Sequence, residues 1–137
     1  MFDKISNNLK ILEKALDASL MRNEVIAQNI ANVDTPNYKK RTVKFEEYLS
    51  AALKSSNFKG FTTHSKHISI GGNDVDSIGI KVTQDYKELS MRLDGNNVDV
   101  EAEMAAMAQN SLQYNTLIQS LSGKYRILKS AISEGRK

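Results

Sequence analysis

The sequence predicts a mainly α-helical protein in which long N- and C-terminal helices pair as a coiled coil around a short, partly extended or flexible middle segment. Apolar residues recur at alternating steps of four and three at both ends of the chain. The middle is instead rich in Ser, Thr, Gly and Asn. We therefore divide the chain into an N-terminal helix (1–33), a turn with a mixed middle segment (34–97) and a C-terminal helix (98–137).

The N-terminal helix is expected from about residue 3 to about residue 32. Good helix formers such as Lys and Glu separate its apolar positions. Pro36 disfavours helical geometry at Thr35, so the helix must end by about Val33 or Asp34. Ser19 and Asn23 interrupt its apolar seam, which consists of Ile5, Leu9, Leu12, Leu16, Ile26, Ile30 and Val33.

The middle segment offers only short elements. The stretch 43–53, VKFEEYLSAAL, reads as a short amphipathic helix. Two alternating pieces, 67–70 and 78–82, read as short strands or extended loop. No independent core is visible in this segment, so we expect residues 54–96 to be flexible or ordered by a partner.

The C-terminal helix is expected from about residue 98 to about residue 133. A turn at Asp94-Gly95 precedes it, and either Asn97 or Asp99 can serve as its N-cap. Ser111 interrupts its seam, which consists of Val100, Met104, Met107, Tyr114, Ile118, Leu121, Tyr125, Leu128 and Ile132. Such narrow stripes indicate that each helix needs a partner, which is the other terminal helix, another copy, or both.

Composition excludes several classes of function. The net charge is +3, with 19 basic and 16 acidic residues, and this mild excess does not indicate nucleic-acid binding. The only short basic run, 39–41, is expected to be a solvated loop. There is no cysteine, which excludes disulfides, cysteine zinc sites and thiol catalysis.

No apolar run approaches the roughly 20 residues that a membrane-spanning helix needs. The N-terminus is also not a Sec signal peptide, because charged and polar residues interrupt every possible hydrophobic run. By these rules alone the protein is expected in the cytoplasm.

The sequence contains weak candidates for chemistry. His64 and His67, with Asp74 and Asp76 nearby, could ligate a metal, but a Gly/Ser-rich loop provides no supporting shell. The stretch 94–103, DGNNVDVEAE, fails the calcium-loop pattern, because its glycine is second rather than sixth. The paired carboxylates Glu46/Glu47 and Glu101/Glu103 are expected to lie on solvated helix faces.

Nucleotide-binding and hydrolase motifs are absent from the sequence. We therefore expect no enzyme activity, no catalytic residue, no metal site and no cofactor, nor a small-molecule substrate.

The stretch 27–41, AQNIANVDTPNYKKR, resembles the N-terminal signature of the flagellar rod and hook proteins. The residues that match it are Asn29, Asn32, Thr35, Pro36 and Tyr38; the usual glycine before the tyrosine is Asn37 here. Asn also tolerates the left-handed conformation, so this departure is mild. Three further stretches, THSKHI, LDGNNVDVEAE and NSLQYN, are similar to the proximal rod proteins of that family.

The resemblance implies a structural subunit of the basal-body rod, which crosses the periplasm or the cell-wall region. It implies export through the flagellar type III apparatus without a cleaved Sec signal, which replaces the cytoplasmic expectation. The implied partners are other copies of the chain, other rod proteins, the membrane-ring/rod adaptor and the export apparatus. The five motif residues are implied to form the turn after the first helix and to contact adjacent subunits.

Two other functions remain open from the residues alone. The heptad seam is compatible with a soluble coiled-coil adaptor or regulator unrelated to flagella. The histidine pair His64 and His67 is compatible with a metal-dependent enzyme, for which the sequence offers no further support.

Overall fold

The computed structural model describes residues 2–55, 64, 79–84 and 93–134. The chain divides into two compact units. The larger unit joins Met1–Val43 to Val82–Lys137, and the smaller unit is Lys44–Lys81.

Helices dominate the described residues, which confirms the predicted mainly α-helical class. The three helices are α1 (Phe2–Ala31), α2 (Glu46–Ser55) and α3 (Val100–Glu134). Both terminal helices begin and end within about two residues of the predicted boundaries. Two short strands, β1 (Arg41–Lys44) and β2 (Lys81–Gln84), form a two-stranded sheet.

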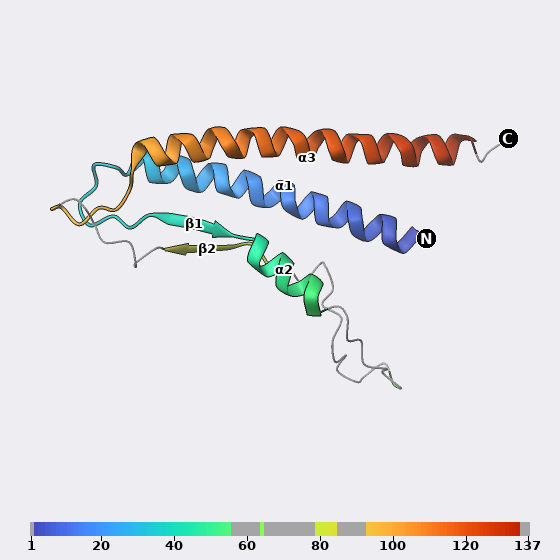
Figure 1. Ribbon diagram of the computed structural model, residues 1–137, viewed down its shortest axis with the longest axis horizontal. Helices are drawn as coiled ribbons and strands as arrows, with labels where there is room; N and C mark the ends of the chain where they lie inside the picture. The colour runs from blue at the N-terminus through green and yellow to red at the C-terminus, as the bar shows by residue number, and fades with distance from the viewer. Residues whose placement is uncertain (1, 56–63, 65–78, 85–92, 135–137) are drawn as a thin grey trace. The chain divides into compact units, whose positions relative to one another are not determined.

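In the larger unit, α1 and α3 lie side by side and run in opposite directions (Figure 1). The buried apolar side chains of this unit are few: Ala18, Val25, Ile26 and Val98. Three of them belong to the C-terminal half of α1, so the tightest packing lies towards the turn that follows this helix. This small core agrees with the narrow apolar stripe of the sequence. No helix of the described ranges is long and apolar enough to cross a membrane.

The end of α1 follows the predicted turn chemistry. The side-chain amide of Asn32 donates to the Gln28 carbonyl at 2.7 Å, one helical turn back. Asn37 adopts a left-handed φ of 59°, as expected for a residue that replaces glycine in this turn. The helix therefore ends before Thr35, the residue at which the following Pro36 disfavours helical geometry.

The start of α3 is capped by Asp99, which decides between the two predicted candidates. Its Oδ1 accepts hydrogen bonds from the backbone N–H groups of Glu101 at 3.0 Å and Ala102 at 3.4 Å. Asn97 has a different role, because its Oδ1 accepts the backbone N–H of Lys40 at 2.7 Å. The N-terminal end of α3 is thus satisfied by a side chain of ordinary capping type.

We expect Asp99→Ala to destabilise the folded chain by about 1 kcal/mol, the usual effect of losing an N-cap. Thermal unfolding followed by circular dichroism measures this change. Asp99→Ser is the matched control, since serine also caps helices and should retain most of the stability. Equal melting temperatures for the Ala and Ser variants would contradict the assignment of the cap.

The strands correct two predictions. Residues 39–41 were expected in a solvated loop, but β1 begins at Arg41. The short helix was expected from Val43, but α2 begins at Glu46, because Val43 belongs to β1. The β-branched side chains of Thr42 and Val43 suit an extended strand, and this preference prevails over the helical pattern.

The two strands run antiparallel (Figure 1). The hydroxyl groups of Thr42 and Thr83 lie 3.2 Å apart across them. β2 begins at Lys81, three residues after the predicted start at Ile78. The other predicted strand, 67–70, lies outside the described residues.

The smaller unit contains α2. Phe45 and Ala52 are buried, and the Phe45 carbonyl accepts the backbone N–H of Leu49 at 2.9 Å. The Lys81 ammonium lies 5.2 Å from the centre of the Tyr48 ring, within the range of a cation–π contact.

Candidate functional site

Asn29 is fully buried near the end of α1, with 0% of its surface exposed. Its Oδ1 accepts hydrogen bonds from the Arg41 backbone N–H at 3.0 Å and the Tyr38 hydroxyl at 3.3 Å. Its Nδ2 donates to the Arg41 carbonyl and to Glu103 Oε2, both at 2.9 Å. The side-chain amide therefore pairs with the backbone of Arg41 as a neighbouring strand would. We call Asn29, Tyr38, Lys40, Arg41 and Glu103 the Asn29 cluster.

Glu103 carries the charge of this cluster. It lies on α3 with 2% of its surface exposed, and its Oε1 is 2.9 Å from Lys40 Nζ. A buried carboxylate is tolerated only when it is paired and hydrogen-bonded, and Lys40 and Asn29 meet both conditions. The expectation of a solvated face is thus wrong for Glu103, as is that of a solvated loop for Lys40. Both errors arise because the partner lies far away in the sequence.

A second buried asparagine, Asn96, binds the turn that follows α1. Its Nδ2 lies within hydrogen-bond distance of the carbonyl oxygens of Asn32, Val33 and Thr35, at 2.9, 2.8 and 2.9 Å. Its Oδ1 accepts the backbone N–H of Val98 at 2.8 Å. Because α1 ends at Ala31, these carbonyl groups belong to the turn that follows it, and Asn96 supplies their partner from the segment that leads into α3.

The segment before α3 approaches the turn after α1 closely. The Asn37 backbone N–H donates to the Asp94 carbonyl at 2.9 Å, and Lys39 Nζ donates to the Gly95 carbonyl at 2.6 Å. Gly95 has a left-handed φ of 77°, and a Cβ there would lie 2.7 Å from Asn37 Oδ1. The sequence signal of a turn at Asp94-Gly95 is therefore confirmed.

A third buried asparagine, Asn110, lies in the middle of the α1–α3 contact. Its Oδ1 accepts the Ser19 hydroxyl at 2.9 Å, and its Nδ2 donates to the Ser19 carbonyl at 2.7 Å and to Asn23 Oδ1 at 2.8 Å. Arg22 Nη1 also reaches Asn110 Oδ1, at 3.4 Å. We call Ser19, Arg22, Asn23 and Asn110 the Asn110 cluster. It explains why Ser19 and Asn23 interrupt the apolar seam of α1.

The seam of α1 lies largely where the pattern placed it. Ile26 is buried, whereas Ile5 is 41% exposed near the start of the helix. The remaining seam residues are half-buried: Leu9, Leu12, Leu16, Ile30 and, just past the helix, Val33.

The seam of α3 differs from the predicted one. Five of the nine predicted residues are half-buried: Val100, Met107, Tyr114, Leu121 and Leu128. The other members are exposed in the single chain, with exposed fractions of 61% for Met104, 37% for Ile118, 46% for Tyr125 and 64% for Ile132. Glu103, Asn110 and Leu117, each next to an expected seam position, are buried or half-buried instead.

The physical reason is that Glu103 and Asn110 have polar partners on α1 or beside it. The helix face that carries them can therefore turn inward without leaving a polar group unsatisfied.

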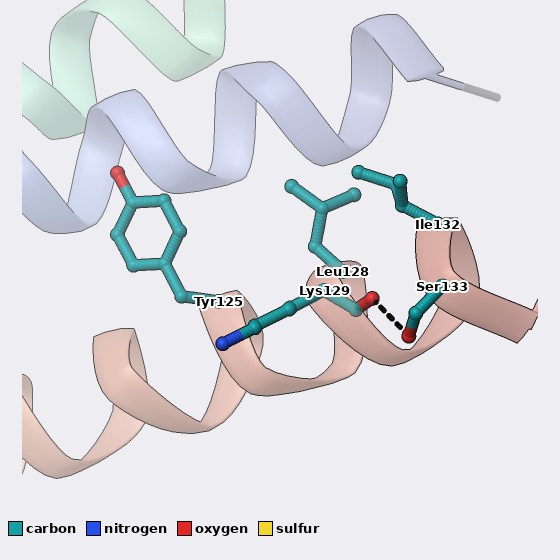
Figure 2. Close-up of a pocket in the computed structure, with 5 residues that line it drawn as sticks. All are labelled: Tyr125, Leu128, Lys129, Ile132 and Ser133. Atoms are coloured by element: carbon teal, nitrogen blue, oxygen red, sulfur yellow. Dashed lines mark hydrogen bonds between the residues drawn. The ribbon is translucent and has the colours of Figure 1, made fainter.

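A shallow groove lies along the C-terminal part of α3. Tyr125 and Leu128 point towards α1 there, as does Ile132 (Figure 2). The Tyr125 hydroxyl donates to Glu13 Oε1 at 2.6 Å. The Glu13 carboxylate accepts this bond and carries negative charge, and both effects raise the pKa of Tyr125 above its ordinary value. The groove is completed by Lys129 and Ser133.

The other predicted residues separate into two groups. Thr35 and Pro36 are exposed, although the Thr35 hydroxyl also donates to Asn32 Oδ1 at 3.2 Å. Of the histidine and aspartate candidates for a metal, only His64 belongs to the described residues; His67, Asp74 and Asp76 lie outside them. Within the described ranges, no three His, Asp or Glu residues come together in a way that could hold a metal ion.

Sequence reasoning missed Asn96, Asn110, Glu103 and Lys40. The signal for Asn110 was the pair of polar interruptions in the seam of α1, which required a polar partner on the opposite helix. The fold and these clusters together define a protein built on an antiparallel helix pair, in which buried asparagines join the two helices to each other and to the turn that follows α1.

Comparison with known proteins gives the family. The family model described as flagella basal body rod protein matches residues 9–39, which include the signature stretch. A flagellar basal body rod protein FlgB of Bacillus subtilis is 35% identical over 131 residues, covering 96% of this chain and 97% of the relative. The FlgB protein of Escherichia coli is 32% identical and covers 98% and 99%. That of Borrelia hermsii is 35% identical and covers 79% and 82%. The chain belongs to the FlgB family of flagellar basal body rod proteins.

Proposed function

We propose that this protein is a structural subunit of the proximal rod of the bacterial flagellum, where it helps to transmit torque from the membrane ring to the distal rod and hook. The observation that carries the proposal is its similarity to FlgB proteins over nearly the whole chain. The long antiparallel helix pair supports it, because such an element can pack against neighbours along its length. Subunits that pack head to tail without closing a ring form a filament.

The outer surface of α3 is suited to contacts with neighbouring subunits. Its exposed apolar side chains include Leu112 at 71%, Ile127 at 72% and Met104 at 61%. Burying one such side chain fully contributes about 1.5–3 kcal/mol. Neighbouring rod subunits cover this surface in the proposed assembly, so that several modest contacts together hold the rod.

The signature residues divide between two roles in this proposal. Asn29 and Asn32 hold the chain after α1, since their amide groups bond within the chain. Thr35 and Pro36 are exposed and are the signature residues that contact adjacent subunits.

The proposed partners are other copies of this chain, other rod proteins, the membrane-ring/rod adaptor and the type III export apparatus. We propose that the subunit is exported without a cleaved Sec signal. Its location is then the periplasmic or cell-wall-spanning rod of the basal body. The role is structural rather than catalytic, with no cofactor, nucleic acid or small-molecule substrate. Family membership disfavours the alternative of a coiled-coil adaptor unrelated to flagella.

We expect Leu112→Asp to abolish or strongly reduce swimming while leaving the isolated chain folded. The side chain is 71% exposed, so a carboxylate there remains hydrated in the free subunit. In an assembled rod the same carboxylate would be buried without a partner, which is strongly unfavourable. Swimming on soft agar and counts of rods in isolated basal bodies measure the effect, and circular dichroism checks the fold.

Leu112→Met is the matched control, because it keeps an apolar side chain of similar volume and should support normal swimming. If Leu112→Asp strains swim as well as those with Leu112→Met, no neighbour covers this part of α3.

A further inference from the structure

The apolar part of the α1–α3 contact does not by itself define how the two helices are aligned. On α3 its half-buried residues Met107, Tyr114, Leu121 and Leu128 recur every seven residues. If α3 slipped along α1 by one heptad, each of these residues would take the place of the next. Apolar burial alone is therefore compatible with several registers.

The polar residues of the contact do not repeat in this way. Glu103 and Asn110 lie seven residues apart on α3, and the next positions in that series are Leu117 and Lys124. A slip by one heptad in one direction brings Leu117 opposite Ser19, and a slip in the other direction brings Glu103 there. Each slip takes Asn110 and Glu103 away from the groups that bind them in the observed register.

Such a loss is unfavourable because these groups are deeply buried. Asn29, Glu103 and Asn110 are 0%, 2% and 2% exposed. A buried amide or carboxylate without its partners bears the full desolvation penalty. In the observed register, every buried side-chain nitrogen and oxygen of the described residues has a hydrogen-bond partner.

We propose that the Asn29 cluster and the Asn110 cluster together select this single register of α1 against α3. Asn110 and Glu103 act as positioning residues: they contribute specificity of alignment, whereas the apolar residues contribute most of the burial. Polar residues within a helix contact are well suited to this role, because a wrong register leaves them unsatisfied.

The register matters for the turn region. Asn96 reaches the carbonyl oxygens of Asn32, Val33 and Thr35 only if the start of α3 lies level with the end of α1. The two clusters thereby determine the shape of the surface that carries Thr35 and Pro36. This inference concerns the single chain and holds whether or not the proposed assembly contacts are correct.

Distance measurements between two spin labels test the proposal. The chain has no cysteine, so Asn7→Cys and Gln109→Cys provide unique labelling sites on exposed positions of α1 and α3. Pulsed electron spin resonance on the full-length protein then gives the distribution of distances. A slip of one heptad displaces the labels by about 10 Å along the helix axis, since each residue rises 1.5 Å.

Three variants isolate the two clusters. Ser19→Ala with Asn110→Leu removes the helix-to-helix hydrogen bonds between these residues in the Asn110 cluster, Asn29→Leu with Glu103→Leu removes the bond between Asn29 and Glu103 in the Asn29 cluster, and the combined variant carries all four changes. Ser111→Leu is the matched control, because it adds a leucine to the exposed side of α3 next to the Asn110 cluster.

We expect one distance for the unaltered chain, for the control and for each two-residue variant, because one intact cluster still selects the register. The combined variant should gain slipped populations, raising their share at least about tenfold, the factor that one unsatisfied buried polar group typically contributes. A single unchanged distance in the combined variant would overturn the proposal. So would slipping in either two-residue variant to the same extent, or loss of helicity in the combined variant under conditions in which both two-residue variants remain helical, because the clusters would then hold the two helices together rather than align them.

Discussion

Replacing Asn29 with leucine should destabilise the folded chain by about 3 kcal/mol, because several buried polar groups lose their partners at once. The Arg41 backbone loses both of its bonds to the amide, and Glu103 loses the N–H that binds its Oε2. For a chain of this size, this corresponds to a fall in melting temperature of roughly 10 °C. Differential scanning calorimetry of the purified protein measures it.

Two variants make the test specific to this network. Asn7→Leu introduces the same change at an exposed position of α1 and should alter stability by less than about 0.5 kcal/mol. Tyr38→Phe removes only the 3.3 Å hydroxyl bond and should cost about 0.5–1 kcal/mol. If Asn29→Leu melts at the same temperature as Asn7→Leu, the buried amide does not hold the chain after α1.

The second large effect concerns two glycines that respond to the same substitution with opposite sign. Gly95→Ala should destabilise the chain by about 1–2 kcal/mol, because Gly95 has a φ of 77°, where a side chain is unfavourable. Gly123→Ala should stabilise it by about 0.5–1 kcal/mol, since alanine is the better helix former. Apart from its chain neighbours and the adjacent backbone of the helix itself, nothing lies within 4 Å of a Cβ at Gly123, so the methyl group meets no obstruction.

Chemical denaturation with urea gives both differences under identical conditions. The close approach of Gly95 to Asn37 Oδ1, 2.7 Å from a Cβ, is tested by adding Asn37→Gly to Gly95→Ala. If strain in the Gly95 backbone dominates, this second change should recover little stability. A Gly95→Ala variant as stable as the unaltered chain would contradict the left-handed turn.

Local signals were sufficient to predict the two terminal helices. The heptad steps, Pro36 after α1 and the capping residues before α3 all act within a few residues, so the sequence displays them directly. The same holds for the turn at Gly95 and for the left-handed Asn37, because glycine, which has no Cβ, and asparagine both tolerate a positive φ.

Contacts between distant residues could not be read in this way. Glu103 has the composition of a solvated helix face, and only the presence of Lys40 and Asn29 explains why it is buried. Strand β1 was missed because its pairing with β2 is non-local. On α3, the apolar pattern indicated one stripe, but the partners of Glu103 and Asn110 turned an adjacent stripe inward. Tertiary context thus overrides a local pattern where polar groups need distant partners.

The central claim is that this chain is a structural subunit of the flagellar basal-body rod. Electron microscopy of basal bodies tests it most directly, using the bacterium that encodes the chain with its gene deleted and the same strain complemented with the intact gene. We expect the deletion strain to assemble membrane rings without rods or hooks, and complementation to restore both. Normal rods, hooks and swimming in the deletion strain would contradict the claim.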